Sequence, residues 1–406
     1  MDARRTVEAV WRMHSARLVA ALTRLVHDVG LAEDFAQDAY LAALEQWPRE
    51  GVPAEPAGWL LTTARRRAID MIRRERVRDE KYALLAVADD DEGGTGTDSE
   101  LLSLVFVACH PVLSQESRAA LTLRLVGGLS TEEIAHAFLV PPATMGQRIS
   151  RAKRTLTEAE VPFAMPDPDA LPARLNAVLE VVYLIFTEGY SATSGDRWIR
   201  RDLAERAMRL GRMLAGLMPT EPEVFGLVAL MELQASRFAA RIGRDGQPVL
   251  LEDQDRGRWD RTLIAHGLGA LSRARGLRKP LGPYTVQAAI AACHARAPRF
   301  ADTDWPAILA LYDALTHLAP SPVVRLNRVV AVLHVDGPQA ALDAVDELRD
   351  DPRLGRYHLF GAIRGDLLMR LGRQAEAADE LERAAGLAPT RQERTLLMER
   401  AAAATR

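Results

Sequence analysis

The residues from Gly127 to Leu156 read GGLSTEEIAHAFLVPPATMGQRISRAKRTL, and this stretch has the pattern of a helix-turn-helix. Ser130 or Thr131 can cap a first helix, and two acids follow in its first turn, where the helix dipole stabilises negative charge. Pro141 and Pro142 end that helix and begin the next, because proline is tolerated in a first helical turn. Apolar residues then recur at helical spacing and predict a buried face made of Met145, Ile149, Ala152 and Leu156.

The second of these helices also has a basic face. Residues 142–157 contain four basic side chains and no Asp or Glu. Polar and basic residues at the start of such a helix suit base edges in a major groove, and positive charge at its end suits phosphates. The alternative is the solvated face of an ordinary helical bundle. The residues predicted to contact DNA are Thr144, Gln147, Arg148, Arg151, Lys153 and Arg154.

Charge is distributed unevenly along the 406 residues, whose formal net charge is only −3. Residues 65–78 contain seven arginines, whereas residues 89–100 contain six acids and no base. Affinity for a polyanion is therefore expected only at two helices, the arginine-rich one and the basic one described above. The net charge of the whole chain does not reveal it, because the acids elsewhere cancel these basic residues.

Apolar residues recur with a helical period nearly throughout, so the fold class is predicted to be all-α. A chain of this length favours two or three domains, each with its own core. Pro48, Gly51 and Pro56 predict a loop before a third helix that ends near Arg78. The predicted helical domains are 1–78, 99–160 and 173–406, joined by an acidic flexible linker at 79–98 and a Pro-rich linker at 161–172.

The C-terminal half has a pattern of small residues that matches a helical repeat. Small residues and a closing proline fall at the offsets of a repeat of about 34 residues, at Gly365, Gly372, Ala377, Ala384 and Pro389. Small residues at these positions let two antiparallel helices approach closely. Such tetratricopeptide-like arrays present a concave surface, so a protein or peptide partner is expected. By contrast, residues 253–256 read as an ordinary loop.

The sequence shows no catalytic constellation. It has no phosphate-binding glycine loop and no HExxH, GxSxG or CxxC motif. Cys109 and Cys293 are too few for a disulfide framework and lack a second ligand pair at zinc-site spacing. We therefore expect a non-enzyme without catalytic residues, cofactor or metal. Because we find neither a signal peptide nor an apolar run of about 18 residues, we expect a reducing cytoplasm and no membrane contact.

Three motifs in order resemble the extracytoplasmic-function (ECF) class of bacterial RNA polymerase sigma-70 factors. Residues 32–40, AEDFAQDAY, resemble region 2.2 of that family. Residues 59–65, WLLTTAR, followed by Ala68-Ile69-Asp70 and Arg73-Arg74, resemble its regions 2.3 and 2.4. The helix-turn-helix then lies where region 4.2 is expected. The C-terminal half resembles the helical-repeat extension of one subgroup, on the basis of Asp336-Gly337-Pro338 and the terminal repeat.

The resemblance implies a set of partners and the residues that bind them. One polar helical face suits a basic partner helix, which the family implies is the β′ clamp of core RNA polymerase, and this face contains Asp34, Gln37, Asp38 and Leu41. The β flap of the polymerase is the second implied contact. Promoter DNA is expected at the −10 element through Trp59, Arg65, Arg66, Arg73 and Arg74, and at the −35 element through the helix-turn-helix. The alternatives are a solvated surface for the polar face and core packing for Trp59.

Two other functions remain open from the sequence alone. An operator-binding helix-turn-helix regulator needs the basic helix but not the polar face and the arginine-rich helix together. A repeat-scaffold adaptor uses the C-terminal half, with the N-terminal half merely targeting it. Our leading interpretation is a factor that directs polymerase to promoters and starts transcription, with a C-terminal helical domain that controls its activity.

Overall fold

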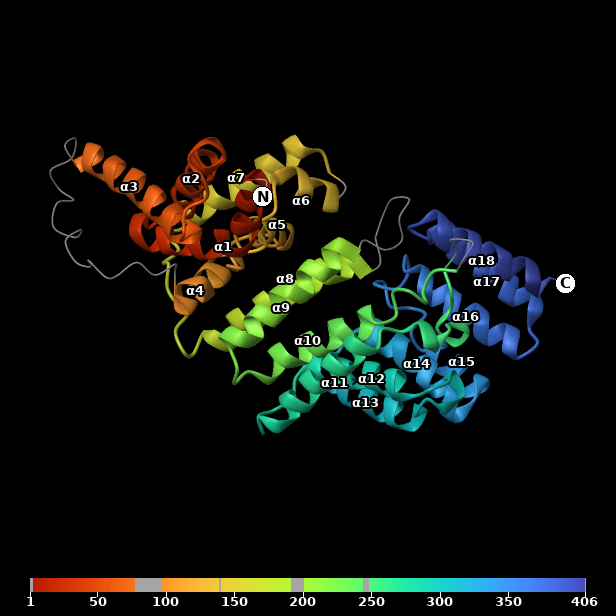
Figure 1. Ribbon diagram of the computed structural model, residues 1–406. Helices are drawn as coiled ribbons and strands as arrows, with labels where there is room; N and C mark the ends of the chain where they lie inside the picture. Colours follow the sequence, from red (N-terminus) through yellow and green to blue (C-terminus); the bar gives the residue numbers. More distant parts are fainter. Residues whose placement is uncertain (1–2, 77–96, 139, 191–200, 244–247, 406) are drawn as a thin grey trace. The chain divides into compact units, whose positions relative to one another are not determined.

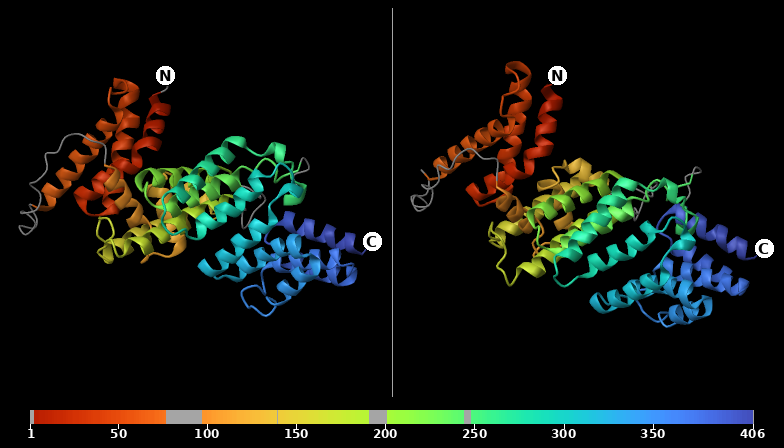
Figure 2. Two further views of the ribbon diagram at one scale, coloured as in Figure 1. Left: turned by 90° about the horizontal axis from the view of Figure 1, so that it is seen from below. Right: turned by 60° about the horizontal axis from the view of Figure 1, so that its bottom comes forward.

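The computed structural model describes residues 3–76, 97–138, 140–190, 201–243 and 248–405. The chain divides into two compact units, Met1–Leu184 and Ile185–Arg406. Both units are built from α-helices (Figures 1 and 2), which confirms the predicted all-α class. The segment expected to be an acidic linker at 79–98 lies almost wholly outside the described residues, so its flexibility stays a prediction.

The first unit begins with three long helices, α1 (Ala3–Val26), α2 (Val29–Glu50) and α3 (Pro56–Arg76). Asp28 caps α2 by accepting a hydrogen bond from the backbone amide of Leu31 at 2.8 Å. The loop predicted to start at Pro48 starts only at Gly51, where a φ of 94° ends the helix. Pro48 lies inside the last turn, where it cannot donate a backbone hydrogen bond, and the helix still closes through the Gly51 amide, which donates to the carbonyl of Trp47 at 3.0 Å.

Four shorter helices follow in the same unit: α4 (Asp98–Ala108), α5 (Gln115–Leu125), α6 (Thr131–Ala137) and α7 (Pro142–Glu158). Helices α6 and α7 form the predicted helix-turn-helix, and the four apolar residues expected to face the core of α7 are all buried. Helix α1 packs against α2, α3 and α4, whereas α7 packs against α5, α6 and α2. The two N-terminal helical segments of the sequence therefore contact each other within one unit.

The described residues of the second unit form helices and short 3-10 turns. Helix α8 (Leu171–Tyr190) contains the division between the units. The remaining helices are α9 (Arg201–Leu217), α10 (Pro222–Ala235), α11 (Arg261–Gly276), α12 (Pro283–Arg296), α13 (Trp305–Leu318), α14 (Pro322–Asp336), α15 (Pro338–Asp346), α16 (His358–Arg370), α17 (Gln374–Leu387) and α18 (Arg391–Ala404). Consecutive helices pack against each other from α12 to α18.

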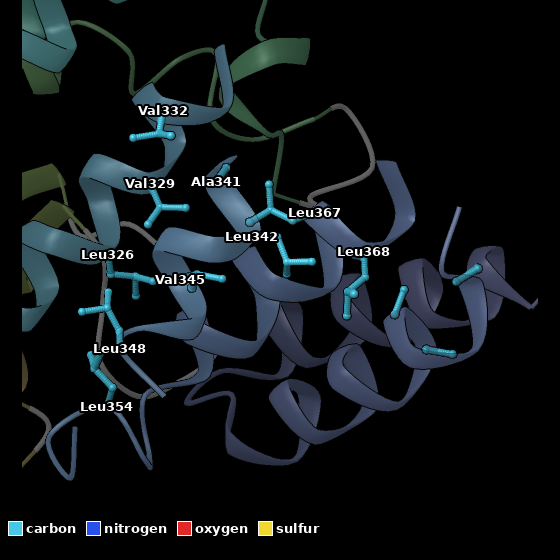
Figure 3. Close-up of a cluster of buried hydrophobic side chains, with 13 residues drawn as sticks. Leu326, Val329, Val332, Ala341, Leu342, Val345, Leu348, Leu354, Leu367 and Leu368 are labelled. Carbon is cyan, nitrogen blue, oxygen red and sulfur yellow. The ribbon is translucent and has the colours of Figure 1, made fainter. Parts of the chain in front are cut away.

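The small residues of the terminal repeat lie where two helices meet. Helix α16 packs on α17, and a Cβ atom added to Gly365 would lie 2.7 Å from Cγ of Leu381. Ala377 and Ala384 of α17 are buried. Figure 3 shows the adjoining core, in which Val329 of α14, Leu342 of α15 and other apolar side chains face one another. Close approach of α16 and α17 therefore depends on these small side chains.

The segment predicted to be an ordinary loop, residues 253–256, is irregular backbone between two short turns, but it also anchors a buried side chain. The segment joins two 3-10 turns, Leu251–Asp253 and Arg256–Arg258, and the Arg256 side chain is buried. Its Nη1 donates hydrogen bonds to the carbonyls of His294 (2.7 Å) and Ala297 (2.8 Å), and Nη2 donates to the hydroxyl of Thr303 at 3.1 Å. One guanidinium with several donors thus connects the segment to the end of α12.

Candidate nucleic-acid interface

Helix α7 presents polar and basic side chains on the side away from its buried face. Thr144, Gln147, Arg151 and Arg154 are exposed, and Arg148 is half-buried. Arg154 forms a surface ion pair with Glu158 one turn later, with 3.4 Å between Nε and Oε1. An exposed pair of this kind contributes little stability, so a DNA phosphate can replace Glu158 as the partner of Arg154.

The start of α6 is held by a capping box. The backbone amide of Glu133 donates to the hydroxyl of Ser130 at 3.1 Å, and the amide of Ser130 donates to Oε2 of Glu133 at 2.8 Å. Ser130, rather than Thr131, is therefore the cap. Gly128, with a φ of +66°, makes the preceding turn. These contacts position α6, against which α7 packs.

Lys153 lies apart from the other basic residues of α7. Its side chain is only 19 % exposed, and its Nζ lies 2.5 Å from Oε2 of Glu33 in α2. One turn later, the Thr157 hydroxyl donates a hydrogen bond to Oδ2 of Asp28 at 2.7 Å. Lys153 therefore already has a carboxylate partner in this arrangement.

Glu33 is a buried acid with partners from two other helices. Its side chain is 5 % exposed, and Oε1 accepts a hydrogen bond from Nε of Arg124 in α5 at 2.5 Å. Arg124 also donates to the carbonyl of Leu129 at 3.0 Å, within the turn before α6. A buried carboxylate with two cationic partners avoids the cost of an unpaired buried charge. This contact joins α2 to both α5 and α7.

Helix α2 presents the predicted polymerase-binding face. Asp34, Asp38 and Leu41 are exposed, and the Leu41 side chain is an exposed apolar group. Gln37 is half-buried, and its amide donates to Oε1 of Glu33 at 2.5 Å. Desolvation by partial burial raises the pKa of Asp34, and the nearby Lys153 opposes this rise.

One further contact links this face to a neighbouring helix. Asp38 pairs with Arg67 of α3, with 3.2 Å between Oδ2 and Nη1. Both side chains are largely exposed, so the pair is weak and can be exchanged for another partner. Three of the four predicted residues thus lie together on one accessible surface, and the fourth connects that surface to Glu33.

A groove of about 410 Å³ lies beside this face. Its lining combines Gln37, Tyr40 and Leu41 of α2 with Ser130 and Glu133 at the start of the helix-turn-helix. The Trp11 ring of α1 packs on that of Tyr40 with centroids 4.8 Å apart. Residues from the two N-terminal segments therefore form this groove together.

Helix α3 carries the residues predicted for the −10 element. Arg66 and Arg73 are exposed, and Arg65 is half-buried. Trp59 is half-buried and packs edge-on against Trp47, with ring centroids 5.5 Å apart. The side chain of Arg74 and the whole of Arg78 lie outside the described residues. Trp59 thus has a packing role in addition to the role predicted for it in DNA binding.

Sequence reasoning missed Glu33 and Arg124. Glu33 follows Ala32 and precedes Ala36, and these alanines are buried on the face of α2 that turns towards the rest of the unit. An acid next to a buried row of small residues is a usable signal, but its partner lies 91 residues away in the sequence. No local pattern indicates such a distant partner.

The second unit has its own cavity of about 250 Å³. Trp305 and His334 stack in its lining, with ring centroids 3.9 Å apart, and Phe300 packs edge-on against both. Leu367 adds apolar surface, and Asp366 and Arg370 supply charge. The cavity combines aromatic packing with a few charged groups, as binding sites for small molecules and peptides do.

Within the described part of the chain, no group of three or more His, Cys, Asp or Glu side chains could hold a metal ion. Burial raises the pKa of the Cys109 thiol to about 11, and Cys293 is half-buried. Among the helices that the structure describes, none has a stretch long and apolar enough to cross a membrane.

Three family models match successive parts of the chain. Residues 10–78 match "Sigma-70 region 2", and residues 103–156 match "Sigma-70, region 4". Residues 174–275 match a "Family of unknown function (DUF6596)". The first two matches contain all the residues predicted from the sequence to bind DNA or polymerase.

Individual relatives match either most of the chain or about a third of it. An uncharacterised protein, R00370 of Rhizobium meliloti (strain 1021), is 45 % identical over 379 residues, which cover 91 % of this chain and 89 % of the relative. The "Probable ECF RNA polymerase sigma factor SigI" of Mycobacterium tuberculosis (strain ATCC 25618 / H37Rv) is 30 % identical over 38 % of this chain and 56 % of its own length. The "ECF RNA polymerase sigma factor SigK" of Mycobacterium ulcerans (strain Agy99) is 27 % identical over 34 % of this chain and 78 % of its own length.

Proposed function

This chain belongs to the ECF-like sigma-70 factors, and from that premise we propose that it directs core RNA polymerase to specific promoters and starts transcription there. The observation that carries the proposal is the coexistence of two surfaces in one unit. One is the basic face of α7, and the other is the polar face of α2 around Asp34 and Asp38. An operator-binding regulator needs only the first of them.

We place promoter recognition on α7 and α3. The exposed residues Gln147 and Arg151 can reach base edges, and Arg154 can neutralise a phosphate. The exposed Arg66 and Arg73 of α3 can hold the backbone near the −10 element, where binding should weaken with rising salt. The cytoplasm, where polymerase and promoter DNA meet, is the proposed location, with no membrane contact.

We propose that core polymerase binds the face formed by Asp34, Gln37, Asp38 and Leu41. Two exposed carboxylates around an exposed leucine suit a partner helix that presents basic and apolar side chains. The family's β′ clamp is the proposed partner of this face, and the β flap is proposed to contact the helix-turn-helix unit. The protein acts as a binding subunit, and we assign it no catalytic step.

We propose that the second unit controls this activity through a protein or peptide partner. Its cavity beside Trp305 and His334 is the proposed site for that partner, because a few charged groups surround apolar and aromatic surface. The proposal leaves both directions of control open. The tetratricopeptide-like pairing of α16 and α17 gives the rigid surface that such a site needs.

Binding of the purified chain to core polymerase tests this function. Asp38→Arg should weaken binding at least about tenfold, because it places a cation where the partner is basic. Glu50→Arg is the matched control, since Glu50 is an exposed acid at the end of the same helix and lies outside the predicted face. The readouts are fluorescence binding to core enzyme and run-off transcription.

Three outcomes separate the candidate functions. Core binding with promoter-dependent transcription supports the proposal. Specific DNA binding without core binding would instead identify an operator-binding regulator. Failure of both, with capture of a protein partner by the second unit, would identify a repeat-scaffold adaptor.

A further inference from the structure

The contact between Glu33, Arg124 and Lys153 has an arrangement that the proposed function does not require. Glu33 is 5 % exposed, and the two basic side chains are each 19 % exposed. Carboxylate oxygen Oε1 faces Arg124, and Oε2 faces Lys153, each at 2.5 Å. A single acid of α2 therefore neutralises one cation from α5 and one from α7, the second helix of the helix-turn-helix.

Further polar contacts join the same two N-terminal segments. Asp28 accepts a hydrogen bond from Thr157 of α7 at 2.7 Å. Arg24 of α1 pairs with Glu100 of α4, with 3.2 Å between Nε and Oε1, and Arg17 pairs with Asp98. Polar contacts of this kind can exchange partners, because a phosphate can take the place of a carboxylate beside a lysine.

The groove next to this contact connects it to the polymerase-binding face. Its lining includes Gln37 and Leu41 together with Ser130 and Glu133 of the helix-turn-helix. The lining of this groove of about 410 Å³ comes from both sides of the Glu33 contact, so the groove keeps its shape only while the helix-turn-helix keeps this position.

We propose that Glu33 latches the helix-turn-helix onto α2 and that this latch must open before polymerase and promoter are bound together. The closed latch withholds Lys153 from DNA, and it holds the side-chain amide of Gln37, a residue of the polymerase-binding face, on Oε1 of the same carboxylate at 2.5 Å. Phosphates of the −35 element compete with Glu33 for Lys153 when the latch opens. This inference rests on the proposed function, because it assigns a regulatory role to the same two surfaces.

The distance between α2 and α5 measures the state of the latch directly, in the full-length chain and without polymerase or DNA. Gln46 of α2 and Gln115 of α5 are exposed, so Gln46→Cys and Gln115→Cys can carry spin labels. Cys293→Ser removes the half-buried thiol, and Cys109, which is 1 % exposed, remains unlabelled. The intact chain should show one narrow distance distribution by double electron–electron resonance.

Glu33→Gln should broaden this distribution and add longer distances, whereas the control Glu50→Gln should leave it narrow. Lys153→Glu tests the latch from the other side, because it places two like charges together. Its matched control is Arg154→Glu, which changes the charge of α7 equally at an exposed position. Circular dichroism shows whether each variant keeps its helices, and a narrow, unshifted distribution in folded Glu33→Gln and Lys153→Glu would overturn the latch.

Binding to core polymerase then separates failure of the latch from failure of the proposed function. Glu33→Gln should bind core about three- to tenfold more tightly, because less of the protein is held closed. If Glu33→Gln broadens the distances but no variant binds core polymerase, the sigma function is rejected, whereas the contact of Glu33 with Arg124 and Lys153 is still shown to hold α2 against α5. Core binding by the intact chain with unchanged distances in Glu33→Gln would reject the latch alone.

Discussion

At the scale of single residues, neighbouring basic side chains of α7 have different surroundings. Lys153 is turned towards Glu33, whereas Arg151 and Arg154 are exposed. The sequence places all three in one basic helix, and only the packing of α7 on α2 separates them. A helical pattern predicts which residues share a face, but it does not predict which face meets a distant acid.

Replacing Arg151 with Ala tests direct contact with the −35 element. We expect a loss of about 1–3 kcal/mol of discrimination if Arg151 bonds to a base edge, and a uniform loss over all sequences if it contacts phosphate. Ser150→Ala is the neighbouring exposed control. Titration of promoter fragments with altered −35 bases measures both effects, and binding equal to that of the intact chain would exclude Arg151 from the interface.

Partly buried histidines should make the second unit sensitive to acid. Burial, assisted by Arg237 and Arg256, lowers the pKa of His294 from 6.5 to about 3. In the unfolded chain His294 therefore becomes protonated below about pH 6.5, whereas in the folded chain it stays neutral down to about pH 3. The free energy of unfolding should fall by up to about 1.4 kcal/mol per pH unit over this window through His294 alone.

Urea unfolding between pH 7 and pH 4.5 checks this expectation. His294→Gln should reduce the slope of stability against pH, whereas His266→Gln, at an exposed position, should leave the slope unchanged. Equal slopes in the intact chain and in His294→Gln would contradict the assignment. His334 and His358 are shifted in the same direction by burial, so a residual slope is expected.

At the scale of elements, the parts predicted best are those that depend on local chemistry. Pro142 at the start of α7, the cap at Ser130 and the apolar row from Met145 to Leu156 are readable from spacing alone. The buried Arg256 was missed because its partners lie about forty residues further along the chain. Glu33 was missed for the same reason, because an ion pair between residues far apart in the sequence produces no repeating pattern from which it could be predicted.

The helix pair α16–α17 allows a sharp test of packing. Gly365→Ala should destabilise the second unit by about 1–3 kcal/mol, because the new Cβ would lie 2.7 Å from Cγ of Leu381. Gly386→Ala in α17 is the matched control: its Cβ would meet nothing within 4 Å, and alanine is the better helix former. Thermal unfolding should show opposite shifts, and a stabilising Gly365→Ala would disprove the close approach.

At the scale of the whole molecule, two sigma-like segments share one unit, and a second helical unit follows. The order of the motifs was enough to predict the family, and the helical period of the apolar residues predicted the all-α fold. The limits predicted for the domains stay predictions, and the division between the units falls inside α8 rather than in the Pro-rich segment before it. Proline content marks where a helix cannot continue, but the packing of α8 decides to which unit its residues belong.

Removal of the second unit tests whether it controls transcription. A chain ending at Leu184 keeps the first compact unit, including the hydrogen bond from Arg174 to the carbonyl of Phe106 at 2.8 Å. We expect promoter output in a purified system to change by at least about fivefold, the lower end of typical coupling between sites. Higher output shows inhibition by the second unit, and lower output shows that it is required.

The full-length chain, assayed at equal core occupancy, is the reference for this comparison. Circular dichroism of the shortened chain first shows that its helices are kept. Equal transcription from the two chains would reject control and leave the second unit as an independent binding module.

The burial of Glu33 also restricts how this protein can evolve. Loss of either cation would leave a buried carboxylate short of a partner, at a cost of several kcal/mol. Loss of the acid alone would remove the carboxylate partner of Arg124, whose side chain is only 19 % exposed. Descendants that change position 33 should therefore carry compensating changes at positions 124 and 153. These three positions should vary together among related sequences, whereas neighbouring exposed positions should vary independently of them.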